Sequence, residues 1–140
     1  MQDRFKFRIW SAINQIMSYE ICFGNFFQKN KTEKEVFDWV SVSYGNDSFI
    51  SYRNTMLDNL KLMQCTGFKD KNGKLIYEGD IVYKKGSKNW KKEKLYSIVI
   101  YDNMYGHFNI SDENGIHNIP QNKDNIEVIG NIYENPELLK

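Results

Sequence analysis

The chain has 140 residues, of which 41% are hydrophobic and 15% aromatic, and its formal net charge is +1. This length suits one domain, and the composition argues against a disordered chain and against a dedicated nucleic-acid-binding protein. The N-terminal MQDRFKFR is too charged for a signal peptide, and no uncharged run near it reaches the roughly 20 apolar residues of a membrane span. We therefore expect a soluble cytoplasmic protein.

Charge is distributed unevenly along the second half of the chain. Residues 67–94 carry nine Lys and four acidic residues, a net charge of +5, whereas residues 102–140 carry two Lys and seven acidic residues, a net charge of −5. These segments could neutralise each other within the fold or meet between copies of the chain. Cys22 and Cys65 show no metal-type spacing and suit a reducing cytoplasm as small buried residues.

The first predicted element is a strand at residues 4–10, RFKFRIW, in which apolar and basic residues alternate. Such period-two alternation is typical of a half-buried strand. The basic residues would then form a row on a solvated face: Arg4, Lys6 and Arg8. A second strand is expected at residues 17–23, MSYEICF, after a turn near Asn14-Gln15.

Residues 24–60 carry mixed signals. Thr32-Glu33-Lys34-Glu35 matches a capping box, which predicts a short helix from Glu33 to about Trp39. The β-branched residues Val36 and Val40 favour a strand instead. We expect a short helix that runs into a strand, an ambiguous stretch at 49–59, and a strand at 60–65.

The stretch Phe68 to Val82, FKDKNGKLIYEGDIV, contains two sharp turns and the start of a strand. Asn72-Gly73 predicts a two-residue hairpin turn, because both residues tolerate positive φ. Glu78-Gly79-Asp80 predicts a second turn. The two aspartates are expected to accept backbone amides at these turns. The residues of this structural turn motif are Gly67, Asp70, Asn72, Gly73, Gly79 and Asp80.

From Asp80 onward the sequence predicts five short strands joined by tight turns, at residues 81–85, 94–101, 107–111, 116–119 and 126–133. A helix start follows at Asn135-Pro136-Glu137. We expect a mostly β protein with a small antiparallel SH3-like barrel at about residues 78–134. The N-terminal strands and the short helix would pack on this barrel. The chain would divide into a β-rich segment, 1–66, and a barrel-like domain, 67–140, or form one integrated domain.

Lysines cluster around a tryptophan at residues 83–94, YKKGSKNWKKEK. They could follow a phosphate backbone while the indole stacks on a base. The cluster has no arginine for bidentate base recognition, so such binding would be non-specific. A solvated loop is the simpler interpretation. The candidate nucleic-acid or anion contact comprises Lys84, Lys85, Lys88, Trp90, Lys91, Lys92 and Lys94.

Tyrosines are numerous in the predicted barrel. Tyrosine brings a large contact area with a polar tip, and SH3-like barrels bind peptides in aromatic grooves. The candidate partner surface comprises Tyr83, Tyr96, Tyr101 and Tyr105.

No residue pattern indicates catalysis, a metal or a cofactor. The chain has no Walker loop, GxGxxG, nucleophile elbow or metalloprotease motif. His107 and His117 lie on adjacent predicted strands at a separation of about 10 Å or more, too far for one metal ion. Glu78 and Asp80 are interpreted as turn acids that accept amides. We therefore expect no catalytic residues, no metal site, no cofactor and no enzymatic activity.

Three segments of the chain resemble the YopX family, known from bacteriophages and prophages. They are RFKFRIW at 4–10, QCTGFKDKNGKLIYEGDIV at 64–82 and IEVIGNIYENPELL at 126–139. The likeness runs end to end and is weakest in residues 20–60. Cys65, Phe68 and Ser11 depart from the family pattern, which has an aromatic residue, Leu and often Asp there. The resemblance implies a β-rich phage protein in the cytoplasm of an infected or lysogenic bacterial cell, and it carries over no catalytic residue.

The sequence therefore favours a non-enzymatic protein-interaction module. Its partner would be a phage or host protein, or a second copy that meets it through the basic and acidic segments. The alternative is weak, non-specific nucleic-acid binding through the loop Lys84 to Lys94, and an enzyme is the third hypothesis.

Overall fold

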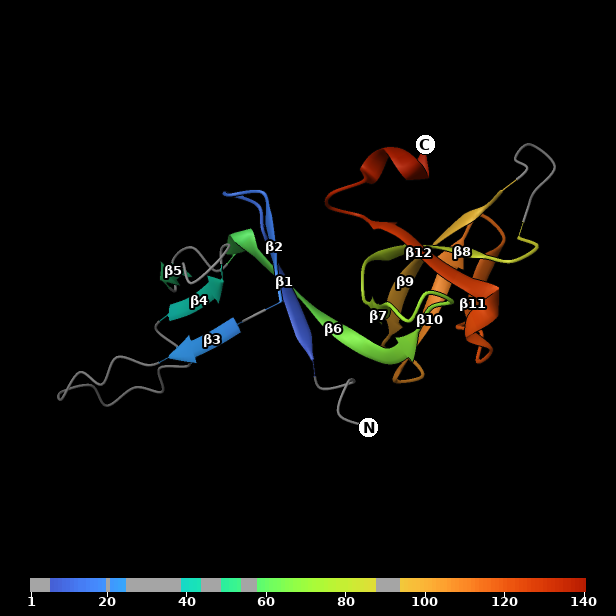
Figure 1. Ribbon diagram of the computed structural model, residues 1–140, viewed down its shortest axis with the longest axis horizontal. Coiled ribbons are helices and arrows are strands. Elements are labelled where there is room, and N and C mark those ends of the chain that lie inside the picture. Colours follow the sequence, from blue (N-terminus) through green and yellow to red (C-terminus); the bar gives the residue numbers. More distant parts are fainter. Residues whose placement is uncertain (1–5, 20, 25–38, 44–48, 54–57, 88–93) are drawn as a thin grey trace. The chain divides into compact units, whose positions relative to one another are not determined.

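The computed structural model describes residues 6–19, 21–24, 39–43, 49–53, 58–87 and 94–140 (Figure 1). The described elements are strands and two short 3-10 helices, which confirms the prediction of a mostly β protein. The chain divides into two compact units. One is Phe7–Met63, and the other is Met1–Lys6 with Gln64–Lys140.

The unit Phe7–Met63 contains three antiparallel strand pairings. β1 (Phe7–Ser11) pairs with β2 (Ile16–Ser18), and β4 (Trp39–Ser43) lies between β3 (Ile21–Gly24) and β5 (Phe49–Arg53). The single strand predicted for residues 17–23 is therefore wrong. The chain changes partner there, because β2 pairs with β1 whereas β3 pairs with β4.

Arg8 contradicts the predicted solvated basic row. It is only 1% exposed, and the residues from Arg8 to Ser11 are all buried. Alternation in the sequence shows which residues are polar, but it does not show whether the polar face of a strand is covered. Arg8 and Ile9 face opposite sides of β1 and both are buried, so both faces of the strand are covered here. Lys6 is exposed, and Arg4 lies outside the described residues.

The helix predicted from Glu33 to about Trp39 lies outside the described residues, except for its last position. Trp39 begins β4, so the predicted strand after that segment is present. The ambiguous stretch 49–59 contains β5. The strand predicted at 60–65 extends further, as β6 (Leu60–Lys69).

The second unit is built on a five-stranded antiparallel sheet that curls into a half-barrel (Figure 1). Its order is β11-β10-β9-β8-β12, so β9 is central, as its apolar character on both faces predicts. The five strands are β8 (Asp80–Lys84), β9 (Tyr96–Asp102), β10 (His107–Asp112), β11 (Gly115–Asn118) and β12 (Ile126–Asn131).

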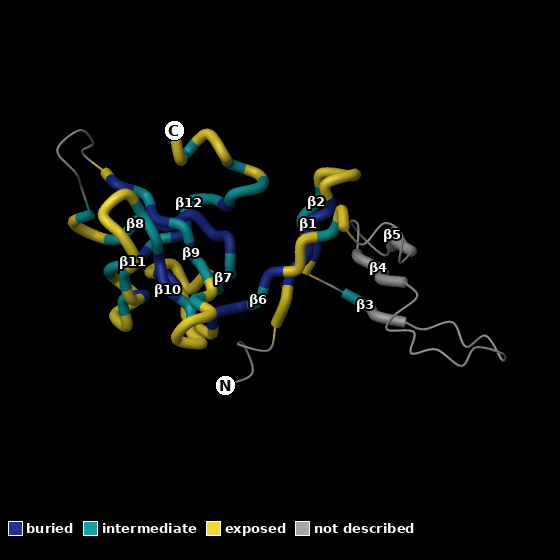
Figure 2. Tube along the Cα trace, turned by 180° about the vertical axis from the view of Figure 1, so that it is seen from behind, coloured by how far each residue is buried: buried dark blue, intermediate teal, exposed yellow. Residues whose placement is uncertain are grey.

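Short elements complete this unit. β7 (Leu75–Tyr77) pairs with β6, the 3-10 helix η3 (Lys123–Asn125) forms the predicted turn before β12, and η4 (Pro136–Leu139) forms the predicted helix start as a 3-10 turn. The core inside the curl is aliphatic and nearly fully buried (Figure 2). It comprises Ile76, Val82, Val99, Ile110, Ile119, Ile126 and Val128.

The turn stretch forms a β6–β7 hairpin, but its geometry differs from the predicted two-residue turn. Asp70 N donates to Lys74 O, and Gly73 N donates to Asp70 O, so the loop has three residues. Gly73 has φ +80°, whereas Asn72 is not among the described residues with positive φ. This pattern matches a type I turn followed by a glycine bulge.

Gly67 also departs from prediction, because it lies within β6 at a shift in the β6–β7 register instead of at a turn. Its φ of +84° is a conformation that glycine adopts without strain. Thr66 Oγ1 donates to Ile76 O and accepts from Phe68 N, which bridges this bulge.

Asp70 is fully buried and joins the hairpin to the last strand of the sheet. Its Oδ1 accepts from Asn72 N and Lys74 N, as expected for a turn aspartate. Its Oδ2 accepts from Val128 N, 58 residues later. Asp80 Oδ2 likewise accepts from Tyr77 N at the second turn. The turn motif therefore fixes the position of β12 as well as its own loops.

None of the described helices is long and apolar enough to cross a membrane.

Candidate binding groove

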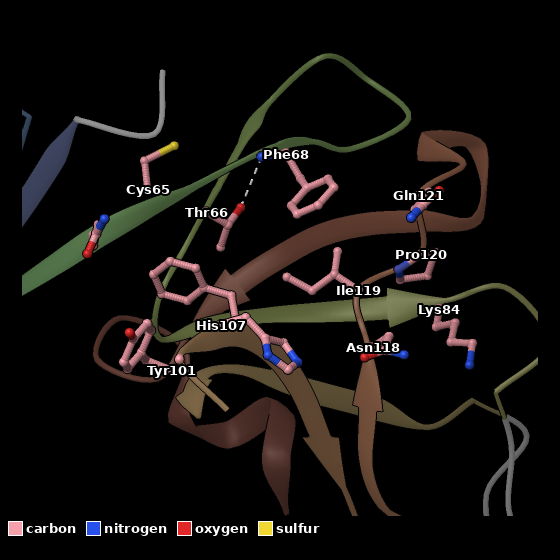
Figure 3. A pocket seen from close by; sticks show the side chains of 13 residues that line it. Cys65, Thr66, Phe68, Lys84, Tyr101, His107, Asn118, Ile119, Pro120 and Gln121 are labelled. Atoms are coloured by element: carbon pink, nitrogen blue, oxygen red, sulfur yellow. Dashed lines mark hydrogen bonds between the residues drawn. The ribbon is translucent and has the colours of Figure 1, made fainter. Parts of the chain in front are cut away.

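A hollow of about 920 Å³ lies on the second unit. Hereafter it is called the groove. It is lined by β6 at Gln64, Cys65, Thr66 and Phe68, by the end of β8 at Lys84, by the β9–β10 hairpin at Tyr101, Gly106, His107 and Phe108, and by Asn118, Ile119, Pro120 and Gln121. Figure 3 shows Tyr101 and Cys65 on one side of it and Lys84 and Gln121 on the other.

Apolar side chains contribute much of the groove wall. Tyr101 and Phe108 are direct cross-strand partners, and their rings meet edge to face at 5.2 Å between centroids. Such aromatic pairs add to the stability of a sheet face. Tyr101 and Phe68 are each about two-fifths exposed, at 41% and 40%, so a ligand could cover both rings.

Polar groups in the groove are available to a ligand. The side-chain amides of Asn118 and Gln121 make no hydrogen bond to a described residue, and the Lys84 ammonium has no carboxylate partner among those residues. A side-chain amide can donate and accept, and an ammonium can pair with a carboxylate. The groove therefore combines exposed aromatic rings with unpaired polar groups, the composition typical of a ligand site.

A second, smaller hollow lies beside the groove, and Lys84, His107 and Asn118 line both. His117 also lines this second hollow. In the sheet His117 is opposite Ile110, three residues from His107, which matches the predicted separation of the histidines. The described residues contain no group of three or more His, Cys, Asp or Glu able to hold a metal ion.

The four predicted partner tyrosines do not form one surface. Tyr101 lies on the core side of β9, on the same side as Val99, and lines the groove. Tyr83 and Tyr96 lie opposite each other on the other face of the sheet, with ring centroids 6.4 Å apart. Tyr105 is 70% exposed on the β9–β10 turn, where its ring lies 6.0 Å from that of His107.

The lysine cluster is also divided. Lys84 lines the groove, Lys85 is exposed just after β8, and Lys94 Nζ lies 5.6 Å from the centroid of the Tyr83 ring. The other members of the predicted contact lie outside the described residues: Lys88, Trp90, Lys91 and Lys92.

Sequence reasoning missed most of the groove. It singled out Tyr101 and Lys84 but not Phe68, Phe108 or Asn118. These residues come from separate strands that only the tertiary fold brings together. The local sequence around each of them indicates a strand residue and gives no sign of a binding role. An alternation pattern reports which residues share a face, but it gives no signal for which strand ends converge.

Comparisons with known proteins agree with this fold. The family model described as YopX protein matches residues 6–140. Protein EF1440 from Enterococcus faecalis has a similar crystal structure, with a TM-score of 0.59, 25% identity, and coverage of 96% of this chain and 97% of that one. The crystal structure of protein yopX from Bacillus subtilis is similar too, with a TM-score of 0.58, 22% identity, and coverage of 96% and 95%.

A search of curated proteins gives no significant match. The family match covers nearly the whole chain, and it includes the resembling segments at 64–82 and 126–139 and residues 6–10 of the first one. This chain belongs to the YopX family.

Proposed function

We propose that this chain is a non-enzymatic protein-interaction module that holds an extended segment of a partner protein in the groove. The observation that carries this function is that the groove combines two kinds of group. It has two exposed aromatic rings, Tyr101 and Phe68, and it has the side-chain amides of Asn118 and Gln121, which make no hydrogen bond to a described residue. Aromatic rings supply contact area, and unpaired amides can bond a peptide backbone.

An architectural analogy supports this function. We infer that the five-stranded half-barrel is SH3-like, and such barrels bind peptides in aromatic-lined grooves. The partner we propose is a phage or host protein in the cytoplasm of a bacterial cell, an expectation based on the family resemblance.

The test is selection from a library of random 12-residue peptides, with the purified full chain as the target. The tightest peptide is then measured against Tyr101→Ala by fluorescence anisotropy. Loss of a central aromatic contact should weaken binding about tenfold or more. Tyr19→Ala is the matched control, because Tyr19 is an exposed tyrosine in the other unit, at 57%. Failure to select any peptide, or equal binding by Tyr101→Ala, contradicts the proposed function.

A second candidate function is weak, non-specific nucleic-acid binding on the opposite face of the sheet. The observation that favours it is the position of Lys94 over the Tyr83 ring, beside Tyr96 and near Lys85. Lysine charge and aromatic stacking together suit single-stranded nucleic acid.

Salt dependence separates the two functions. Binding of oligonucleotides to the sheet face that carries Tyr83 and Lys94 should weaken steeply as the salt concentration rises, because each phosphate contact releases a counterion. Tyr83→Ala should remove it and Tyr101→Ala should not. Absence of binding at low salt eliminates this candidate.

A further inference from the structure

The two edges of the five-stranded sheet differ in one respect. At the β12 edge, the β6–β7 hairpin satisfies the backbone, because Lys71 N donates to Ile126 O and Asp70 accepts from Val128 N. At the β11 edge, no described strand, loop or side chain bonds to Gly115–Asn118 from outside the sheet. Every second residue of an edge strand directs its N–H and C=O away from its neighbour.

The open edge is also exposed and uncharged. Ile116 is 58% exposed, and β11 carries no Lys, Arg, Asp or Glu (Figure 2). A charged residue is a common protection for an edge strand, so β11 lacks one of the usual barriers to pairing. Its protection is limited to its short length, with Pro120 close behind it.

Hollows lie along this edge. Asn118 lines both the groove and the second hollow, Ile119 lines the groove, and Ile116 lines the second hollow. In strand addition, a peptide bonds to the edge through its main chain while alternate side chains enter pockets. β11 provides the open edge for main-chain hydrogen bonds, and the two hollows beside it provide pockets for side chains.

The charge in the two hollows indicates the chemistry of the partner. Lys84 lines both hollows without a carboxylate partner among the described residues. Lys84 is the only Lys, Arg, Asp or Glu among the described residues that line the groove, whereas Asp102 also lines the second hollow. Asp102 accepts from two turn amides and from Asn109, and Asp112 accepts from Ser97 and contacts His117.

We propose that β11 receives an extended peptide segment as an added strand, and that this segment carries an Asp or Glu for Lys84 and an apolar side chain for the groove. This binding mode depends on the proposed function of the groove. A second copy of the chain is a poorer occupant, because pairing of two identical edges would bring two copies of Lys84 to one interface.

The first test uses the tightest peptide from the 12-residue library and its N-methylated versions, one position at a time. Methylation of an amide that donates to β11 should weaken binding about fivefold to tenfold, and methylation of its neighbours should not, so the effect should alternate. The peptide should also be rich in Asp and Glu. A peptide that binds but tolerates methylation at every position overturns strand addition while the proposed function stands. Selection of no peptide overturns both.

The second test changes the protein. Asn118→Pro removes a backbone N–H at the edge, and Asn118→Ala removes only the side chain. Lys84→Glu should weaken binding about tenfold and should favour a peptide with Lys in place of its acid. Lys123→Glu, an exposed charge reversal in η3, is the control. If Lys84→Glu and Lys123→Glu bind alike, the acidic partner is excluded. If Asn118→Pro does not fold, the methylation series on the peptide still decides strand addition.

Discussion

At the scale of single residues, the Asp70 carboxylate connects two distant parts of the chain. It accepts two amides in its own loop and one from Val128. In Asp70→Asn, the amide that replaces Oδ2 is a donor and would face the Val128 N–H. Because a buried unsatisfied donor and a lost charged hydrogen bond are both costly, we expect the free energy of unfolding to fall by about 2–3 kcal/mol.

Denaturant unfolding measures this loss as a lower midpoint, and the m-value should stay unchanged. Asp124→Asn is the control, because Asp124 is exposed and its carboxylate makes no hydrogen bond or ion pair with a described residue. Equal stability of Asp70→Asn and the native chain would show that the Val128 bond contributes little.

Gly73 is a second residue whose backbone can be tested by itself. Its φ is +80°, and a Cβ added there would meet nothing within 4 Å, so any cost is conformational strain. We expect Gly73→Val to lower the thermal stability by the equivalent of about 1–3 kcal/mol. Gly73→Asn should cost less, since asparagine tolerates a left-handed conformation. A Gly73→Val variant with unchanged thermal unfolding would contradict this description of the turn.

At the scale of elements, the β11 and β12 edges should differ in amide hydrogen exchange. Val128 N is bonded to a buried carboxylate, so its exchange should require an opening close to global unfolding. Outward-facing amides of β11 should exchange quickly in the free protein and slow when the selected peptide is added. NMR-detected exchange measures both. Slow exchange throughout free β11 would indicate that this edge is already covered.

Sequence patterns are sufficient to predict some of the elements but not others. The strands after Asp80, the central position of β9 and the turn before β12 follow from local alternation and turn residues. The break between β2 and β3 and the burial of Arg8 do not follow, because both depend on which strand the chain packs against. The loop that ends at Gly73 has three residues instead of the predicted two, because the sequence Asn-Gly does not determine which residues close the loop.

At the scale of the whole molecule, the basic and acidic segments have at least one contact within the chain. Lys71 Nζ of the basic segment lies 2.7 Å from Glu127 Oε2 of the acidic segment. Neutralisation inside the fold would leave little charge to drive pairing between copies. We therefore expect the same monomer mass by analytical ultracentrifugation at low and high salt. A larger mass at low salt that falls at high salt would instead support self-association.

The candidate groove is a property of the whole unit, and this is why the sequence predicts so little of it. Tyr101 and Lys84 are predictable as an aromatic and a cation. Their convergence with Phe68 and Asn118 depends on the curl of the sheet and on the position of β6. The hydrogen bond from Val128 to Asp70 is unpredictable for the same reason, because 58 residues separate its partners.

The most direct measurement is an NMR titration of the isotopically labelled full chain with the selected 12-residue peptide. We predict that the largest amide shift changes occur in Ile116–Gln121 and around Phe68 and Tyr101. Shift changes confined to the face of Tyr83 and Tyr96, or no change at a saturating concentration of peptide, would contradict the groove as the binding site.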